Sequence, residues 1–161
     1  MSLLDSVLGR ATPVNREELL AICEKKIANG EHQEAAQMAQ KYKNRVLDST
    51  ELSEKQKALD VSYAYYLIGK AVFSSINANP AFRTYDYFKA FFAAHRVGYR
   101  YFQQVLMKED DEWDQESEYY PYLKQLDSFY DDLYTTCHDN PELERADLDA
   151  NREVSLAQRD C

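Results

Sequence analysis

Glycine and proline are scarce in this chain, which has four of each among 161 residues. Folds made of many short strands need turn residues more often, so this scarcity disfavours a β-sandwich or β-barrel. No apolar run approaches the ~20 residues that a membrane-spanning helix needs. The first ten residues, MSLLDSVLGR, lack the basic start and long apolar stretch of a signal peptide. These absences predict a cytoplasmic protein with no membrane contact.

The motifs of familiar catalytic and metal sites are missing as well. The sequence contains no HExxH, CxxC, phosphate-binding loop or GxSxG. Its three histidines are far apart, at His32, His95 and His138. Its three cysteines have no spacing typical of zinc ligands or of a disulfide framework, at Cys23, Cys137 and Cys161. We therefore expect no enzyme activity, no metal, no cofactor, and thiols that stay reduced.

What is abundant indicates helices. Hydrophobic residues make up 45% of the chain, including 13 tyrosines and seven phenylalanines, which is enough for a packed core. Apolar residues recur at helical spacing in five segments, at about 16–29, 35–47, 53–76, 82–108 and 122–134. The sequence predicts an all-α domain over residues 1–141, either an antiparallel bundle or an irregular array of helical hairpins with five to six helices. Residues 142–161 are expected to form an acidic tail, either as a weak helix or mobile.

Several residues are typical of helix ends and of close helix contacts. Asn15 with Glu18, and Ser53 with Gln56, have the form of capping boxes. Gly30 is a typical stop signal. Two further glycines, Gly69 and Gly98, fall inside predicted helices, where glycine costs ~1 kcal/mol relative to alanine. We expect close helix approach there, with backbone access for a ligand as the alternative.

The segment IANGEHQEAAQMAQKY resembles the middle of a tetratricopeptide repeat. Gly30 corresponds to the turn between the two helices, and Ala35 and Ala39 to the small-residue positions of the second helix. The resemblance covers about residues 16–48, because the later predicted helices are too long for a repeat of ~34 residues. It implies binding of a peptide or protein on a concave helical surface, without chemistry.

Residues 82–108 carry five cations and one anion among many aromatic residues. Lys89, Arg96 and Arg100 fall on one helix face, and we call them the cationic stripe. Flanking tyrosines would make a cationic, aromatic-lined groove for a carboxylate-bearing partner segment, since arginine binds carboxylates in bidentate fashion. The tyrosines proposed to provide contact area are Tyr63, Tyr66, Tyr85 and Tyr99. The function expected is that of an adaptor, a chaperone-like protein or an assembly subunit that binds another protein or peptide.

The alternative for the cationic stripe is that it pairs within the chain. Candidate partners are Asp127, Asp131 and Asp132, or the acidic loop at residues 109–118, which holds seven carboxylates. Residues 1–108 carry 15 cations and 11 anions, whereas residues 109–161 carry four cations and 17 anions. The two parts of the chain are therefore expected to attract each other.

The acidic residues suggest a second function. The formal charge of −9 disfavours direct nucleic-acid binding. An acidic inhibitor, of the immunity type or a nucleic-acid mimic, could instead block a basic partner. The acidic surface proposed for this role consists of Glu109, Asp110, Asp111, Glu112, Trp113, Asp114, Asp131 and Asp132. Trp113 either anchors the loop on the core or contacts the partner. Homodimerisation through exposed aromatic residues remains open under either function.

His95 is the one histidine with a candidate role, because it falls in the aromatic segment at residues 82–108. A hydrogen-bonded core histidine is the simpler interpretation. The alternative is a small-molecule pocket around His95, which requires a cavity beside the ring.

Overall fold

The computed structural model describes residues 13 and 15–159. Residues 1–12, whose sequence lacks the features of a signal peptide, and Cys161 lie outside this part. The described residues form six α-helices and no β-strand, so the all-α prediction is confirmed. The helices are α2 (Arg16–Ala28), α3 (His32–Asp48), α4 (Glu54–Ala78), α5 (Tyr85–Leu106), α6 (Tyr120–Cys137) and α7 (Pro141–Arg159). A short 3₁₀ turn, η1 (Pro80–Phe82), separates α4 from α5.

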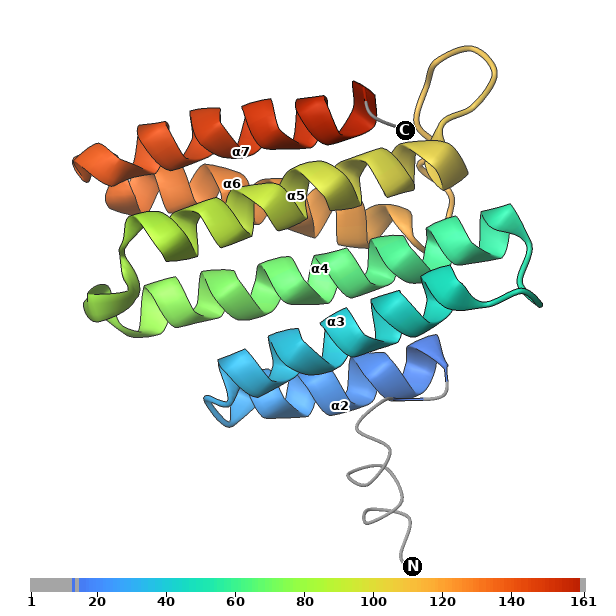
Figure 1. The fold of residues 1–161 in the computed structure, drawn as a ribbon, viewed down its shortest axis with the longest axis horizontal. Coiled ribbons are helices and arrows are strands. Elements are labelled where there is room, and N and C mark those ends of the chain that lie inside the picture. The colour runs from blue at the N-terminus through green and yellow to red at the C-terminus, as the bar shows by residue number, and fades with distance from the viewer. Residues whose placement is uncertain (1–12, 14, 160–161) are drawn as a thin grey trace, which may run out of the picture.

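The helices are arranged in two layers (Figure 1). Helices α3, α4, α5 and α7 lie side by side, while α2 lies behind α3 and α6 lies behind α5. Short connections make α2 and α3, and likewise α4 and α5, antiparallel neighbours. Helix α7 runs parallel to α5, because α6 carries the chain back across the molecule between them.

The predicted helix ends are present. The Asn15 side chain accepts a hydrogen bond of 2.8 Å from the Glu18 amide at the start of α2. Gly30 ends that helix with φ +81°, a left-handed conformation that favours glycine. Ser53 and Gln56 form a complete capping box, with both reciprocal bonds at 3.2 Å. These local signals fix the α2–α3 hairpin and the start of α4.

The helix expected from about residue 82 begins three residues later, at Tyr85. Pro80 instead opens the 3₁₀ turn, and the Asn79 side chain accepts a hydrogen bond of 3.0 Å from the Ala81 amide. A proline fits the first turn of a helix but not its interior, so α4 must end before it. The turn therefore separates two helices whose apolar residues follow each other along the sequence with only a short gap.

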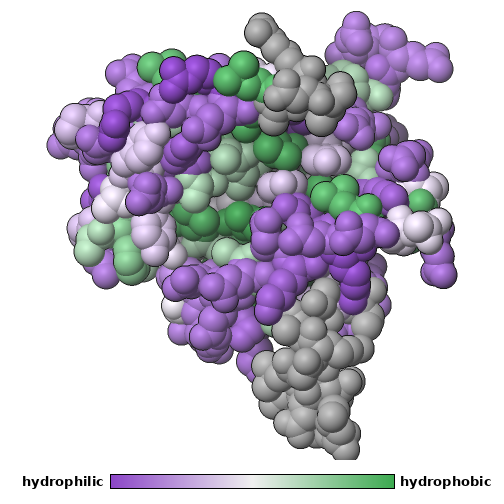
Figure 2. Space-filling view, in the orientation of Figure 1, coloured by the Kyte–Doolittle hydropathy of each residue, from purple (hydrophilic) through white to green (hydrophobic). Residues whose placement is uncertain are grey.

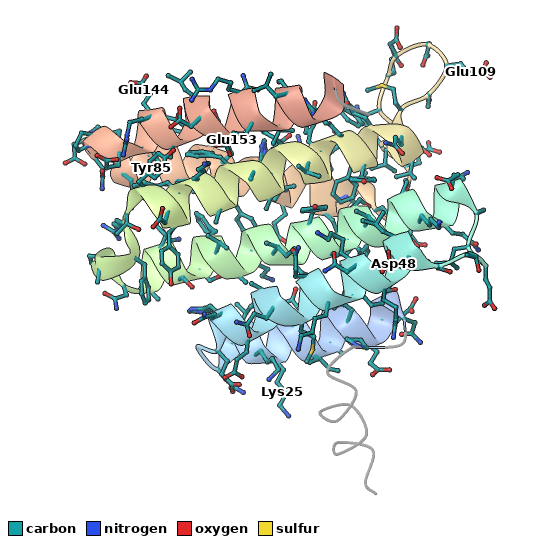
Figure 3. The ribbon with its side chains drawn as sticks, in the orientation of Figure 1. Lys25, Asp48, Tyr85, Glu109, Glu144 and Glu153 are labelled. Carbon is teal, nitrogen blue, oxygen red and sulfur yellow. The ribbon has the colours of Figure 1, made fainter. Side chains whose placement is uncertain are left out.

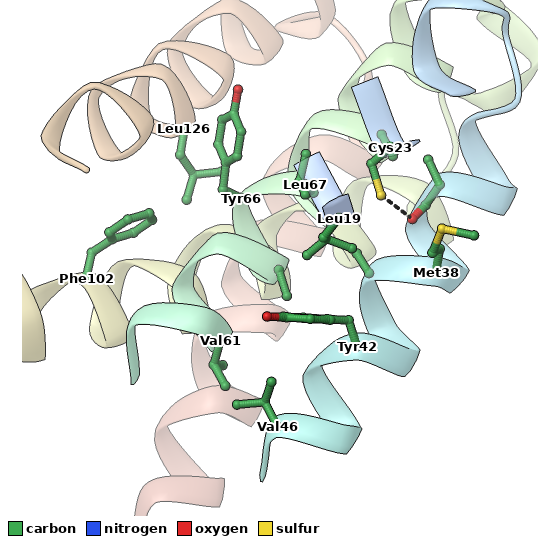
Figure 4. Close-up of a cluster of buried hydrophobic side chains, with 14 of the residues drawn as sticks. Leu19, Cys23, Met38, Tyr42, Val46, Val61, Tyr66, Leu67, Phe102 and Leu126 are labelled. Carbon is green, nitrogen blue, oxygen red and sulfur yellow. Dashed lines mark hydrogen bonds between the residues drawn. The ribbon is translucent and has the colours of Figure 1, made fainter. Parts of the chain in front are cut away.

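Two hydrophobic clusters form the core. The first joins α2 and α3 to the middle of α4, the end of α5 and the start of α6, with Leu19, Tyr42 and Leu126 among its buried members (Figure 4). The second joins the end of α4 and the start of α5 to α6 and α7, and includes Phe88 and Phe92.

Helix α7 belongs to this second cluster through its buried residues Leu143, Ala146 and Ala150. Of the two forms expected for this acidic segment, the helix is therefore the one present over residues 142–159, and its buried residues pack it on the domain. The small alanines let α7 approach α5 closely, and they carry a weaker hydrophobic signal than leucines would.

Gly69 and Gly98 lie where helices approach closely, as expected. A methyl group added at Gly69 would come within 2.8 Å of Leu126 Cδ1. One added at Gly98 would lie 3.0 Å from Tyr65 Cβ and 3.4 Å from Leu126 Cδ2. The two glycines thus allow α6 to insert Leu126 against the α4–α5 hairpin.

Candidate partner-binding surfaces

Helix α7 covers the cationic stripe. Lys89 Nζ lies 2.6 Å from Glu153 Oε1, Arg96 forms an ion pair with Asp147, and Arg100 Nη1 donates a hydrogen bond of 3.2 Å to the Val154 carbonyl. Figure 3 shows Glu153 on α7 above the α5 helix that carries the stripe. The place predicted for a partner segment is thus occupied by the chain's own last helix. The cations do find partners within the chain, but on α7 and not at Asp131 or Asp132.

Asp147 connects three helices. Its carboxylate accepts hydrogen bonds from Tyr130 Oη at 2.7 Å and Tyr134 Oη at 2.6 Å, besides its ion pair with Arg96. Asp147 itself is buried. A buried carboxylate needs such donors, because its desolvation is otherwise too costly. This contact fixes α7 against both α5 and α6.

The ionisable groups in the core predict a loss of stability at high pH. Burial raises the pKa of the Cys23 thiol from 9.0 to about 12, and burial together with the hydrogen bond to Asp147 raises the pKa of Tyr130 from 10.0 to about 12. Because these pKa values are raised on folding, their contribution is complete below the unfolded values of 9.0 and 10.0 and disappears as the pH rises toward about 12. We expect the helical circular dichroism to decrease over this range together with the appearance of tyrosinate absorbance. Full tyrosinate absorbance with unchanged helicity would contradict this expectation.

The four predicted tyrosines do not line one site. Tyr85 Oη donates a hydrogen bond of 2.5 Å to Asp149 on α7, and Tyr99 makes an edge contact with Trp113 at 5.4 Å between ring centroids. Tyr63 and Tyr66 instead face α6, where both rings contact Tyr122, at 4.7 and 5.0 Å. The predicted groove is therefore not assembled, because the α4 tyrosines lie on another side of the bundle from the cationic stripe.

His95 is partly buried and has the hydrogen bond that the simpler interpretation expected, but it belongs to neither core cluster of the described residues. Its Nε2 lies 2.9 Å from Asp127 Oδ1, and its side chain is 13% exposed. The ring lies 4.9 Å from that of Tyr130. A cavity of about 290 Å³ lies beside the ring. The alternative interpretation, a small-molecule pocket around His95, requires such a cavity.

The acidic loop is a short, ordered projection between α5 and α6. The Lys108 amide donates to the Glu112 carbonyl at 2.8 Å, and the Asp114 amide donates to the Leu106 carbonyl at 2.7 Å. Trp113 packs against the first core cluster, so it acts as the anchor of the loop. The carboxylates at the loop tip are exposed, and no ion pair involves them within residues 15–159. They are Glu109, Asp110, Asp111 and Glu112.

The two further acidic residues proposed for this surface lie apart from the loop. Asp131 and Asp132 are exposed on α6, which begins at Tyr120. At 1.5 Å per residue, Asp131 lies roughly 16 Å along the helix axis from that start. The acidic loop and these aspartates therefore do not form one compact acidic patch.

The structure also has an apolar surface on α4 and α5 that the sequence did not predict. Half-buried apolar side chains follow each other on α4 and α5, and we call them the apolar face: Tyr65, Ile68, Val72, Ala93, Val97 and Tyr101. The rings of Tyr65 and Tyr101 are stacked, with centroids 6.1 Å apart, which sets the two stripes on the same side. Within each helix, the residues of the apolar face are three or four positions apart, so they lie on one side of that helix. Figure 2 shows hydrophobic residues gathered over α4 and α5 between hydrophilic borders.

Lys43 of α3 flanks the apolar face. Its Nζ lies 5.3 Å from the centroid of the Tyr65 ring and 3.4 Å from Tyr65 Oη. Burial lowers the pKa of Lys43. Lys43 is itself buried, and no carboxylate of the described residues pairs with it, so its contact with Tyr65 supports that ring at the edge of the apolar face.

Comparisons with protein-family models, with curated proteins and with solved structures found no match. No helix in the described part of the chain has both the length and the apolar character needed to cross a membrane. Among these same residues, no group of three or more His, Cys, Asp or Glu side chains is placed to hold a metal ion. The function has to be inferred from the surfaces alone.

Proposed function

We propose that this protein is a non-catalytic protein-interaction module that binds an amphipathic helical segment of a partner on the apolar face. The observation that carries the proposal is the apolar face itself, six half-buried apolar side chains on two adjacent helices with one lysine at their edge. The roles that fit are those of an adaptor, a chaperone-like protein or an assembly subunit. We place it in the cytoplasm, where free thiols such as Cys23 and Cys137 stay reduced.

The chemistry of the face supports a helical partner. Soluble monomers rarely expose large contiguous apolar patches except at interaction sites. Amphipathic helices bind such surfaces through apolar residues spaced by three, four and seven positions. Tyr65 and Tyr101 offer rigid contact area, which is typical of residues that contribute most to binding.

A peptide-display selection would test this proposal. Random helical peptides selected on the protein are expected to carry an apolar stripe at helical spacing. Ile68→Asp combined with Val97→Asp should weaken binding of the selected peptides at least tenfold, which corresponds to ~1.4 kcal/mol. The control is Lys25→Gln on α2, which is exposed and lies away from α4 and α5.

The proposal fails if no apolar peptides are selected, or if the double substitution leaves their affinity unchanged while circular dichroism shows a folded protein. If the selected peptides resemble helices of this chain itself, the apolar face would instead be assigned to homodimerisation. Each outcome is visible in the same experiment.

The acidic loop supports a second candidate function, the blocking of a basic partner. The specific observation is that its four tip carboxylates are exposed and held on an ordered turn anchored by Trp113. Peptides rich in Lys and Arg would then be selected in place of apolar ones. Changing Glu109, Asp110, Asp111 and Glu112 to Gln and Asn would abolish their binding, whereas the substitutions on the apolar face would not.

A further inference from the structure

The cavity beside His95 lies between α5 and α7 and has a basic lining. Its volume is about 290 Å³, and it is lined by His95, Arg96, Tyr99, Arg100, Gln103 and Asn151. No Asp or Glu is among the lining residues. A pocket of this size, at the lower end of the range for ligand sites, accommodates a small molecule and not a polypeptide segment.

The two arginines of the lining are held in place by other residues. Arg96 is oriented by its ion pair with Asp147, which Tyr130 and Tyr134 hold in turn. Arg100 donates to the Val154 carbonyl, and no carboxylate of the described residues pairs with it. The charge of Arg100 is therefore not neutralised by a contact within this part of the chain.

Two buried nitrogen atoms of the lining residues also lack a partner. His95 Nδ1 and Arg96 Nε have no hydrogen-bond partner within the described structure. The opposite nitrogen of His95 is engaged by Asp127, which orients the imidazole ring. Gln103 and Asn151 add neutral amide groups, which can donate hydrogen bonds. The lining thus combines fixed cations with neutral donors.

We propose that this cavity binds a small oxyanion, a phosphate or carboxylate compound, through the guanidinium groups of Arg96 and Arg100. Guanidinium groups bind such oxyanions through paired, charge-assisted hydrogen bonds. The ligand would contact α5 and α7 together, so it would stabilise the packing of α7. This site is separate from the apolar face and does not depend on the function proposed for that face.

Nuclear magnetic resonance of the histidine side chains gives a direct test, because the chain has only three histidines. Phosphate and citrate are titrated separately at fixed pH, with chloride at matched ionic strength as the reference. We expect the His95 resonances to shift with saturation, while those of His32 and His138 stay in place. Saturation by phosphate alone or by citrate alone would tell the two kinds of oxyanion apart, and either result supports the site.

Substitution at Arg100 is the second part of the test. Arg100→Gln should weaken the binding about tenfold or more, since it removes a charged donor of paired hydrogen bonds to the oxyanion. Lys89→Gln removes one charge from the same helix outside the cavity and should leave the affinity unchanged. The proposal is overturned if His95 does not respond, if chloride shifts it equally, or if Arg100→Gln binds as the wild type does while remaining folded.

Discussion

Asp147→Ala is expected to lower the free energy of unfolding by about 3 kcal/mol. The substitution leaves the Arg96 guanidinium without its ion-pair partner and removes the acceptor of two tyrosine hydroxyl groups. Removing the carboxylate is costly because the largely buried Arg96 loses its counter-ion, and its Nε is already buried without a hydrogen-bond partner within the described structure. Urea unfolding followed by circular dichroism measures the loss.

Asp149→Ala is the matched control for this substitution. Asp149 also lies on α7 and accepts a hydrogen bond from a tyrosine, Tyr85, but it is less buried than Asp147. Solvent can replace its contacts, so we expect a clearly smaller loss of stability. Equal effects of the two substitutions would show that Asp147 has no special role in holding α7.

Gly98→Leu is expected to destabilise the protein by about 3 kcal/mol, at the upper end of overpacking effects. The first side-chain atom alone would lie 3.0 Å from Tyr65 Cβ, an atom that cannot move without the α4 backbone. The better helix propensity of leucine offsets less than ~1 kcal/mol of this cost. Thermal unfolding would show the change as a lower Tm.

Ala90→Leu serves as the control for Gly98→Leu. Ala90 is on the same helix but is exposed, so a larger side chain meets no neighbour there. We expect its stability to stay within ~0.5 kcal/mol of the wild type. If Gly98→Leu were tolerated as well as Ala90→Leu, the close approach of α4 and α5 at this glycine would be refuted.

Local signals in the sequence predicted most of the fold. The caps at Asn15 and Ser53 and the stop at Gly30 act within a few residues, so their effect does not depend on the rest of the chain. The glycines inside α4 and α5 predicted close packing, because a helix retains glycine at a cost. Such signals suffice for helices and hairpins.

The docking of α7 could not be predicted in the same way. Its buried face consists of Leu143, Ala146 and Ala150, which are sparse among charged residues. The only sign of this face in the sequence is the spacing of three and four residues between its members. Two of the three are alanines, which are only weakly hydrophobic, so the helical pattern is faint. The division of charge along the chain did indicate attraction between the two parts, and the pairs of Lys89 and Arg96 with α7 are of this kind.

The cationic stripe shows why binding sites are harder to predict than folds. Its three residues share a face of α5, as the spacing indicated, but the spacing cannot tell whether that face meets a partner or another helix of the same chain. The apolar face had the opposite problem. Ile68 and Val97 look like core residues in the pattern, and only the arrangement of the helices leaves them half exposed.

Site-specific photocrosslinking would test directly whether a partner binds on the apolar face. Three variants each carry one photoreactive amino acid, at Val97 on this face, at Glu112 in the acidic loop, or at Lys25 on α2. Each variant is expressed and irradiated in cells of the organism that the protein comes from. We expect one discrete adduct from position Val97 that is lost when Ile68→Asp is added, and none from Lys25. A discrete adduct from Glu112 with none from Val97 would contradict it and favour the acidic loop as the binding surface.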